Sequence, residues 1–407
     1  MTEDTDRPWA AFRYRDFRLL WGTLLAGGVA LWLRILGTAQ WLLEATGSPL
    51  VVGAIGAVQL AVQIPALLWG GTLADHVDRR RLVTAAHGVT FAALLALGLL
   101  DRSGALAPWM VFVAIAVTAS SQMLGNPSRA ALAAASVPER HLVRAVSADN
   151  ATGNVAAIAG PLVFAWISTT AGLTATFLTG AALAAVAAAA PLALRLRGTP
   201  EVRSEGSTWR RTVEGLRYTA RHPILPGLFL LDWGITVVSF YREILPVLAL
   251  GMFAAGASAT GVLGAANSAG AVAGALVAGL LAAWRAKGML VLWASLAYAL
   301  LLFAFAGATQ LWVGAALIAL LGATDAVTVT VRHGTVMLTT PDAMRGRAYA
   351  VMILAAQTAN NVGTIWVGFW AGAIGANDTI LLGGVLSLLA TLAIWRLWTP
   401  IRSYRAD

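Results

Sequence analysis

Cysteine and charge are what this sequence lacks most. None of the 407 residues is cysteine, which excludes disulfide bonds and thiolate metal sites. Charged residues make up only 12% of the chain, whereas soluble domains carry about 25%. So few charges cannot keep a chain of this length in water. A soluble globular protein, a disordered chain and a nucleic-acid-binding protein are therefore excluded, despite the formal net charge of +9.

Lysine is almost absent as well. Lys287 is the only lysine among the 28 basic residues, and no glycine-rich phosphate loop ending in lysine occurs. This argues against ATP hydrolysis within the chain. The apolar segments contain no His/Glu metal cluster and no Ser/His pair, so we expect no enzyme and no cofactor.

Long apolar runs dominate the sequence instead. Hydrophobic residues make up 58% of it, and a bilayer crossing needs about 20 mostly apolar residues. We therefore expect an all-α integral membrane protein with twelve transmembrane helices in two pseudo-symmetric six-helix bundles. The predicted spans are 18–43, 50–74, 82–100, 109–134, 143–168, 173–195, 224–250, 257–283, 289–308, 311–338, 346–372 and 378–398.

The basic residues predict the orientation and the domains. Of the 28, 23 fall in segments on one side of the predicted helices, and Arg102 alone falls on the other. Basic loops stay in the cytoplasm, so we expect both termini there. The longest break, 196–223, separates a six-helix bundle at 1–195 from one at 224–407. It is either a plain tether or, over Trp209–Tyr218, an amphipathic helix on the inner leaflet.

The two halves repeat in parallel. Arginines and prolines recur at matching positions, for example Pro138 with Pro341, whereas matches of alanine or glycine would carry little weight in this composition. Further matching pairs are Arg34 with Arg242, Gln59 with Asn267, and Arg129 with Arg332. Duplicated halves predict a pseudo-two-fold axis along the membrane normal and a binding site between the halves.

Seven charged side chains are predicted at membrane depth. They are Arg34, Arg129, Asp232, Arg242, Glu243, Asp325 and Arg332. All lie in the first, fourth, seventh and tenth predicted helices. Each costs about 2.5–3.5 kcal/mol near the bilayer centre, so these four helices should line a shared polar interior. The alternative is that the charges form ion pairs that only hold the bundle together.

Helical spacing groups the polar residues further. Asp325, Thr328 and Arg332 fall at i, i+3 and i+7, on one face of the tenth helix. Gln122, Asn126 and Arg129 form the equivalent stripe on the fourth. We predict a substrate cavity lined by Arg34, Arg242, Gln59, Gln122, Asn126, Asn267, Arg332, Gln357, Asn361, Trp32, Trp233 and Tyr241. The amides could instead form interhelical hydrogen bonds, and some aromatic residues could belong to the interface belts.

Two motifs carry a family resemblance. The segment from Gly71 to Arg81, with Asp75 followed by the basic triplet Arg79, Arg80 and Arg81, resembles the signature loop of the major facilitator superfamily. Gly160 and Pro161 resemble the proton-antiporter motif of its exporters, although Phe164-Ala165 replaces the trailing glycine pair. The chain is most similar to the branch of enterobactin exporter-like, secretion and drug-efflux proteins. This resemblance implies a bacterial inner-membrane transporter.

The resemblance also implies that the first motif forms a cytoplasmic gate. Asp75 could face the positive N-terminus of the helix that starts near Gly346, which is worth typically 0.3–1 kcal/mol. It could also pair with Arg129 on the fourth helix. Either contact would hold the cytoplasmic side shut in the outward-facing state. The alternative is a simple positive-inside anchor.

An ion gradient is then the expected energy source. A buried carboxylate near an arginine can exchange a proton, and Asp325 is the first choice, followed by Asp232 and Glu243. Arg34 and Arg242 resemble, in position only, the arginine pair of the superfamily's organophosphate antiporters. They could bind a carboxylate, phosphate or catecholate. Alternatively, they form a gating salt bridge, since Glu243 adjoins Arg242.

The sequence thus predicts a monomeric secondary transporter whose partners are a small-molecule substrate, protons and the bilayer. The favoured mechanism is proton-coupled export of a small amphipathic molecule, such as a siderophore or drug, by alternating access. The alternatives are an importer of a small acidic solute, working as a symporter or uniporter, and a non-transporting sensor or scaffold with the same fold.

Overall fold

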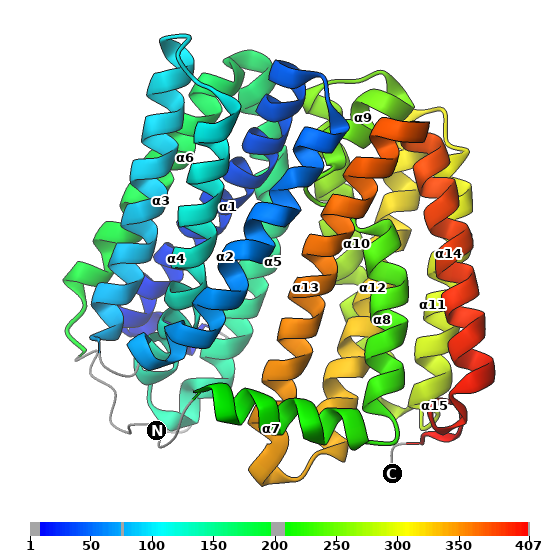
Figure 1. The fold of residues 1–407 in the computed structure, drawn as a ribbon. Helices are drawn as coiled ribbons and strands as arrows, with labels where there is room; N and C mark the ends of the chain where they lie inside the picture. Colours follow the sequence, from blue (N-terminus) through cyan, green and yellow to red (C-terminus); the bar gives the residue numbers. More distant parts are fainter. Residues whose placement is uncertain (1–8, 75–76, 197–207, 406–407) are drawn as a thin grey trace. The chain divides into compact units, whose positions relative to one another are not determined.

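The structure is a computed structural model that describes residues 9–74, 77–196 and 208–405. These residues form helices and contain no β-strand (Figure 1). By packing, the chain divides into two compact units. The first comprises Met1–Trp41 and Ala61–Glu205, and the second comprises Leu42–Leu60 and Gly206–Asp407.

The first six helices start and end within a few residues of the predicted spans. They are α1 (Arg15–Thr46), α2 (Pro49–Ala74), α3 (Arg79–Arg102), α4 (Pro108–Ala135), α5 (Glu139–Thr170) and α6 (Gly172–Ala189). Short 3-10 turns occupy Ala10–Arg13 and Ala190–Ala193. The first part of α2, up to Leu60, groups with the second unit. There Gly53 lies against Gly368, and a Cβ on Gly53 would be 2.9 Å from the Gly368 Cα.

The remaining helices belong to the second unit. They are α7 (Thr208–Arg221), α8 (Leu225–Ser239), α9 (Leu245–Phe253), α10 (Ala257–Leu280), α11 (Lys287–Ala306), α12 (Leu311–Thr339), α13 (Asp342–Ile374), α14 (Ala376–Leu397) and α15 (Thr399–Ser403). A 3-10 turn, Leu281–Ala283, follows α10. The helix α7 falls within the long break that separates the predicted bundles, and it turns by 98° into α8.

Ten of the described helices are long and apolar enough to cross a membrane, or eleven counting the bent pair of α7 and α8. The chain is therefore a multi-pass membrane protein. Neither α9 nor the 33-residue α13 is among these ten.

The prediction of one continuous helix over 224–250 is wrong. Helix α8 ends at Ser239, the backbone of Phe240 is extended, and α9 begins at Leu245. The physical reason is Pro246 in the first turn of α9. Proline has no N–H and its ring clashes with the carbonyl four residues earlier, which is that of Arg242, so the helix cannot continue through this point.

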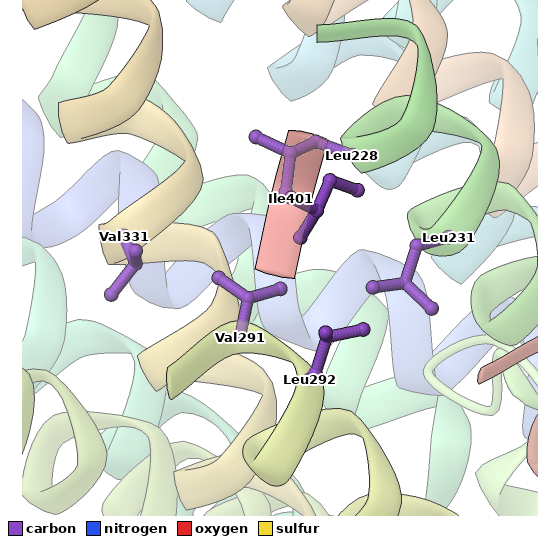
Figure 2. Packing of buried hydrophobic residues seen from close by; sticks show 6 residues of the cluster. All are labelled: Leu228, Leu231, Val291, Leu292, Val331 and Ile401. Carbon is purple, nitrogen blue, oxygen red and sulfur yellow. The ribbon is translucent and has the colours of Figure 1, made fainter. Parts of the chain in front are cut away.

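An apolar cluster anchors one end of the second unit. Figure 2 shows its side chains converging from four helices. They are Leu228 and Leu231 of α8, Val291 and Leu292 of α11, Val331 of α12, and Ile401 of α15. Leu228, Leu231 and Val291 also line the polar cavity described next, so this packing holds α8, α11 and α12 in place around it.

Candidate functional site: a charge cluster in the second unit

A buried ion pair joins α8 to α12. The Nη1 atom of Arg332 contacts the Oδ1 atom of Asp232, and the two side chains are only 7% and 12% exposed. The Arg332 Nε atom has no hydrogen-bond partner among the described residues. Because each charge alone would be costly to bury, the two side chains depend on each other.

A small cavity surrounds this pair. It has a free volume of about 20 Å³, enough for about one water molecule. The polar lining residues are Asp232, Thr236, Ser295, Tyr298, Asp325, Thr328 and Arg332. The structure thus brings together the three residues that the i, i+3, i+7 spacing places on one face of α12, and it adds Asp232 from α8.

Two buried tyrosines extend the cluster towards the helix break. The Tyr298 hydroxyl is 3.2 Å from the Ser239 hydroxyl, and Asn267 donates a hydrogen bond of 2.6 Å to the Tyr241 hydroxyl. Asn267 also donates to the carbonyl of Ile318 at 3.3 Å. Asn267 therefore links α10 both to the break and to α12, which is the interhelical role that the sequence left open for the amides. Tyr298 was not among the predicted site residues.

The break between α8 and α9 changes the predicted arrangement of Arg242 and Glu243. Both lie in the non-helical segment and not, as predicted, within the seventh helix. Glu243 is 6% exposed, and its Oε2 atom has no hydrogen-bond partner among the described residues. Arg242 is exposed, and its guanidinium lies over the ring of Phe240, 5.4 Å from the centroid. Non-helical backbone at membrane depth occurs where it is buried in protein or lines a water-filled cavity.

The first unit has its own buried pair. The Nη1 atom of Arg129 on α4 is 2.9 Å from the Oδ2 atom of Asp149 on α5, and both side chains are less than 15% exposed. Both residues line a pocket that also includes Asn150 and Asn154. The set of seven buried charges was therefore incomplete, because Asp149 also lies within a predicted span, 143–168. Asp149 could therefore have been identified from the sequence by its position inside a predicted span.

Other predicted cavity residues lie in varied surroundings. Gln122 is half-buried and Asn126 is exposed, and neither lines the pocket around Arg129. Gln59 and Asn361 are buried in the second unit. Gln357 accepts a hydrogen bond of 3.4 Å from Asn360 on its own helix.

The predicted arginine pair and the aromatic residues also have identifiable positions. Arg34 is buried on α1 in the first unit. Its pairing with Arg242 across a pseudo-axis stays a prediction, because Arg242 belongs to the second unit. The Trp233 indole donates a hydrogen bond of 3.0 Å to the carbonyl of Ala355, so it joins α8 to α13.

The antiporter-like motif has a packing role. A Cβ on Gly160 would lie 2.6 Å from the Trp32 Cβ, so only glycine allows α5 to approach α1 this closely. Pro161 follows inside the same helix and is buried. The Gly160–Trp32 contact thus links one residue of the motif to one of the predicted cavity residues.

The structure describes only some residues of the predicted cytoplasmic gate. Asp75 lies outside the described residues, and Gly71 is in the last turns of α2. Asp78 caps α3: its carboxylate accepts a hydrogen bond from the Arg80 backbone N–H at 2.8 Å and pairs with the Arg80 guanidinium at 3.2 Å. Burial raises the pKa of Asp78, but the hydrogen bonds and the charge of Arg80 outweigh it, so the pKa is lowered overall. The neighbours of Arg80 in the triplet are Arg79, which begins α3, and Arg81, which is exposed.

Comparison with known proteins adds the following. The sequence profile of a family described as transmembrane secretion effector matches residues 6–406. No curated protein matches the sequence.

Solved transporter structures share the fold. A mutant peptide transporter POT in complex with alafosfalin superposes with a TM-score of 0.76 at 13% identity, covering 97% of this chain and 96% of that one. A mutant of the nucleoside transporter NupG gives 0.74 at 14% identity, covering 93% and 99%. A POT family transporter in complex with 5-aminolevulinic acid gives 0.72 at 12% identity, covering 95% and 97%.

Proposed function

Because the chain belongs to the transmembrane secretion effector family of the major facilitator superfamily, we propose that it exports a small amphipathic molecule in exchange for protons. The transport cycle is alternating access, with both termini in the cytoplasm of a bacterial inner membrane and the monomer as the working unit. In this proposal α8 and α9 together form one membrane crossing and α13 forms another, which makes twelve. Siderophores and drugs are both classes of small amphipathic molecule that fit this proposal.

The charge balance of the cavity in the second unit carries the proposal. Two carboxylates, Asp232 and Asp325, and one cation, Arg332, line a space for about one water molecule. Arg332 pairs with Asp232, so Asp325 is the surplus carboxylate of the lining, and the charge of Arg242 outside the lining also acts on it. Net charge at membrane depth is costly, and binding one proton at Asp325 removes it. Asp325 is therefore the proposed proton carrier, with Asp232 as the group that holds Arg332 in place.

We place the proposed substrate site at the break between α8 and α9. Discontinuous helices form the substrate sites of many secondary transporters, because the unwound backbone offers free polar groups. Here the break contains Tyr241, Arg242 and Glu243. Arg242 is exposed and suits an acidic group on the substrate.

The test is transport by purified protein in proteoliposomes under an imposed pH gradient, with a panel of siderophore-like and drug-like compounds. Asp325→Asn should abolish gradient-driven flux while substrate binding persists. Asp378→Asn, the same chemical change at an exposed carboxylate in the first turn of α14, is the matched control and should transport normally.

Each other outcome has a definite meaning. Normal gradient-driven export by Asp325→Asn removes Asp325 as the proton carrier. Substrate accumulation in the direction of the proton flow identifies an importer instead. Binding without any flux identifies a sensor or scaffold.

A further inference from the structure

A pocket at the junction of α7, α8 and α13 is not explained by transport. It has a volume of about 530 Å³, within the range of small-molecule sites, which is about 300–1,000 Å³. Its lining consists of Glu214, Arg217, Tyr218, Arg221, His222, Pro223, Met344 and Arg347. All of these residues lie in the second unit, so the pocket is complete within one compact body.

The pocket has a surplus of positive charge. Glu214, its only carboxylate, pairs with Arg347 at 2.8 Å and with Arg210 at 3.0 Å. Arg217 and Arg221 are exposed, and no carboxylate of the described residues pairs with either. These two guanidinium groups lie one turn apart on α7, so they can hold one anion between them.

His222 adds no charge to this balance. Its Nδ1 atom accepts hydrogen bonds from the backbone N–H groups of Ile224 and Leu225 at 3.2 and 3.3 Å, so it caps the start of α8. Burial lowers the pKa of His222, which keeps the ring neutral. The anion-binding charge therefore comes from the arginines alone.

The helix α7 has the geometry of a helix lying in a membrane surface. It meets the membrane-crossing α8 at 98° and lies across the end of α13 (Figure 1). Tyr218 packs into the apolar cluster of Leu225 and Ala348, which fixes one side of α7 to the bundle. On another side Trp209 and Leu216, seven residues apart, are 63% and 57% exposed. An amphipathic helix with an exposed tryptophan beside a basic stripe is typical of binding at the interface of an anionic bilayer.

We propose that this pocket binds a phosphate ester, supplied by the headgroup of an anionic phospholipid. Arginine forks bind phosphate oxygens bidentately, and basic pockets on the cytoplasmic side of membrane proteins recognise lipid headgroups. The position of α7 favours the lipid over a free phosphate ester, because the helix turns away from α8 by 98° and lies across the end of α13, at the level where lipid headgroups meet membrane-crossing helices (Figure 1). The site is separate from the charge cluster on α12, and lipid binding is measured without any transport.

The test uses the full-length purified protein in detergent and short-chain phosphatidylglycerol as the probe, with binding measured by native mass spectrometry. The double variant Arg217→Gln and Arg221→Gln should bind phosphatidylglycerol about 30-fold more weakly, since each basic residue near a membrane surface contributes roughly fivefold. Arg402→Gln with Arg405→Gln removes two exposed arginines from the same unit and should bind like the wild type. Unchanged melting temperature without lipid shows that the variants are folded.

The outcomes separate the two sources of phosphate. Phosphatidylcholine, which has no net charge, should bind weakly and equally to all variants. sn-Glycerol 3-phosphate is the free ester, and binding as tight as that of phosphatidylglycerol would overturn the lipid assignment. Equal phosphatidylglycerol binding by the two double variants would overturn the site itself.

Discussion

Replacing Asp232 by asparagine would leave the Arg332 guanidinium buried without its ion-pair partner. Breaking a buried pair typically costs about 3–5 kcal/mol, and side chains that are 7% and 12% exposed leave little room for water to compensate. Asp325 lines the same cavity and can take over part of the pairing. We therefore expect a loss near the lower end, about 3 kcal/mol.

The double variant Asp232→Asn with Arg332→Gln removes both charges and leaves two amides that can hydrogen-bond to each other. Its loss should be smaller than that of either single variant, because no uncompensated charge remains. Thermal unfolding in detergent of the wild type, the two single variants and the double variant measures this coupling. Arg332→Gln alone leaves two carboxylates on one cavity, so its deficit should shrink in acid, where a carboxylate takes up a proton.

The reasoning is refuted if the losses of the single variants add up, within about 0.5 kcal/mol, to that of the double variant. Additivity would mean that Asp232 and Arg332 do not interact strongly in the folded protein, and the surplus-carboxylate argument for Asp325 would fail with it.

Two further predictions concern the first unit. Gly160→Leu should lower the melting temperature and the transport rate, because its side chain would collide with Trp32. Gly88→Leu on α3, where a Cβ meets nothing within 4 Å, should change neither, and equal effects would contradict the packing role. Asp78→Ala should cost about 1 kcal/mol as a lost helix cap. Since the pKa of Asp78 is lowered in the folded protein, this contribution is present at neutral pH and is lost as the pH falls through that lowered pKa. A stability difference between variant and wild type that persists unchanged in acid would rule out the carboxylate as its source.

Most of the helices could be predicted from the lengths of the apolar runs and from the helical spacing of the polar residues within them. The run from Leu311 to Thr339 forms one helix, and the spacing of Asp325, Thr328 and Arg332 placed them on one cavity. These features are local, since they depend only on residues within a few turns of each other. The helix break before Pro246 could also have been predicted from nearby residues, because proline disfavours a helix through the residues that precede it. The continuous apolar run around Pro246 led instead to the prediction of a single helix.

Partner choice could not be predicted in the same way. Which carboxylate pairs with Arg332 or Arg129 depends on how helices distant in sequence pack. The approach of Gly160 to Trp32 is equally non-local. The sequence therefore identified the kind of residue in each site better than the contacts it makes.

Helix α2 is shared between the two units. Its first part, up to Leu60, groups with the second unit through the contact of Gly53 with Gly368, and the part from Ala61 groups with the first. Pro65 has no N–H to offer the carbonyl of Ala61, the first residue after this change of unit. The hydrogen-bond ladder of α2 therefore lacks a rung close to the point where the helix passes from one unit to the other, so we expect α2 to bend more easily there than an unbroken helix.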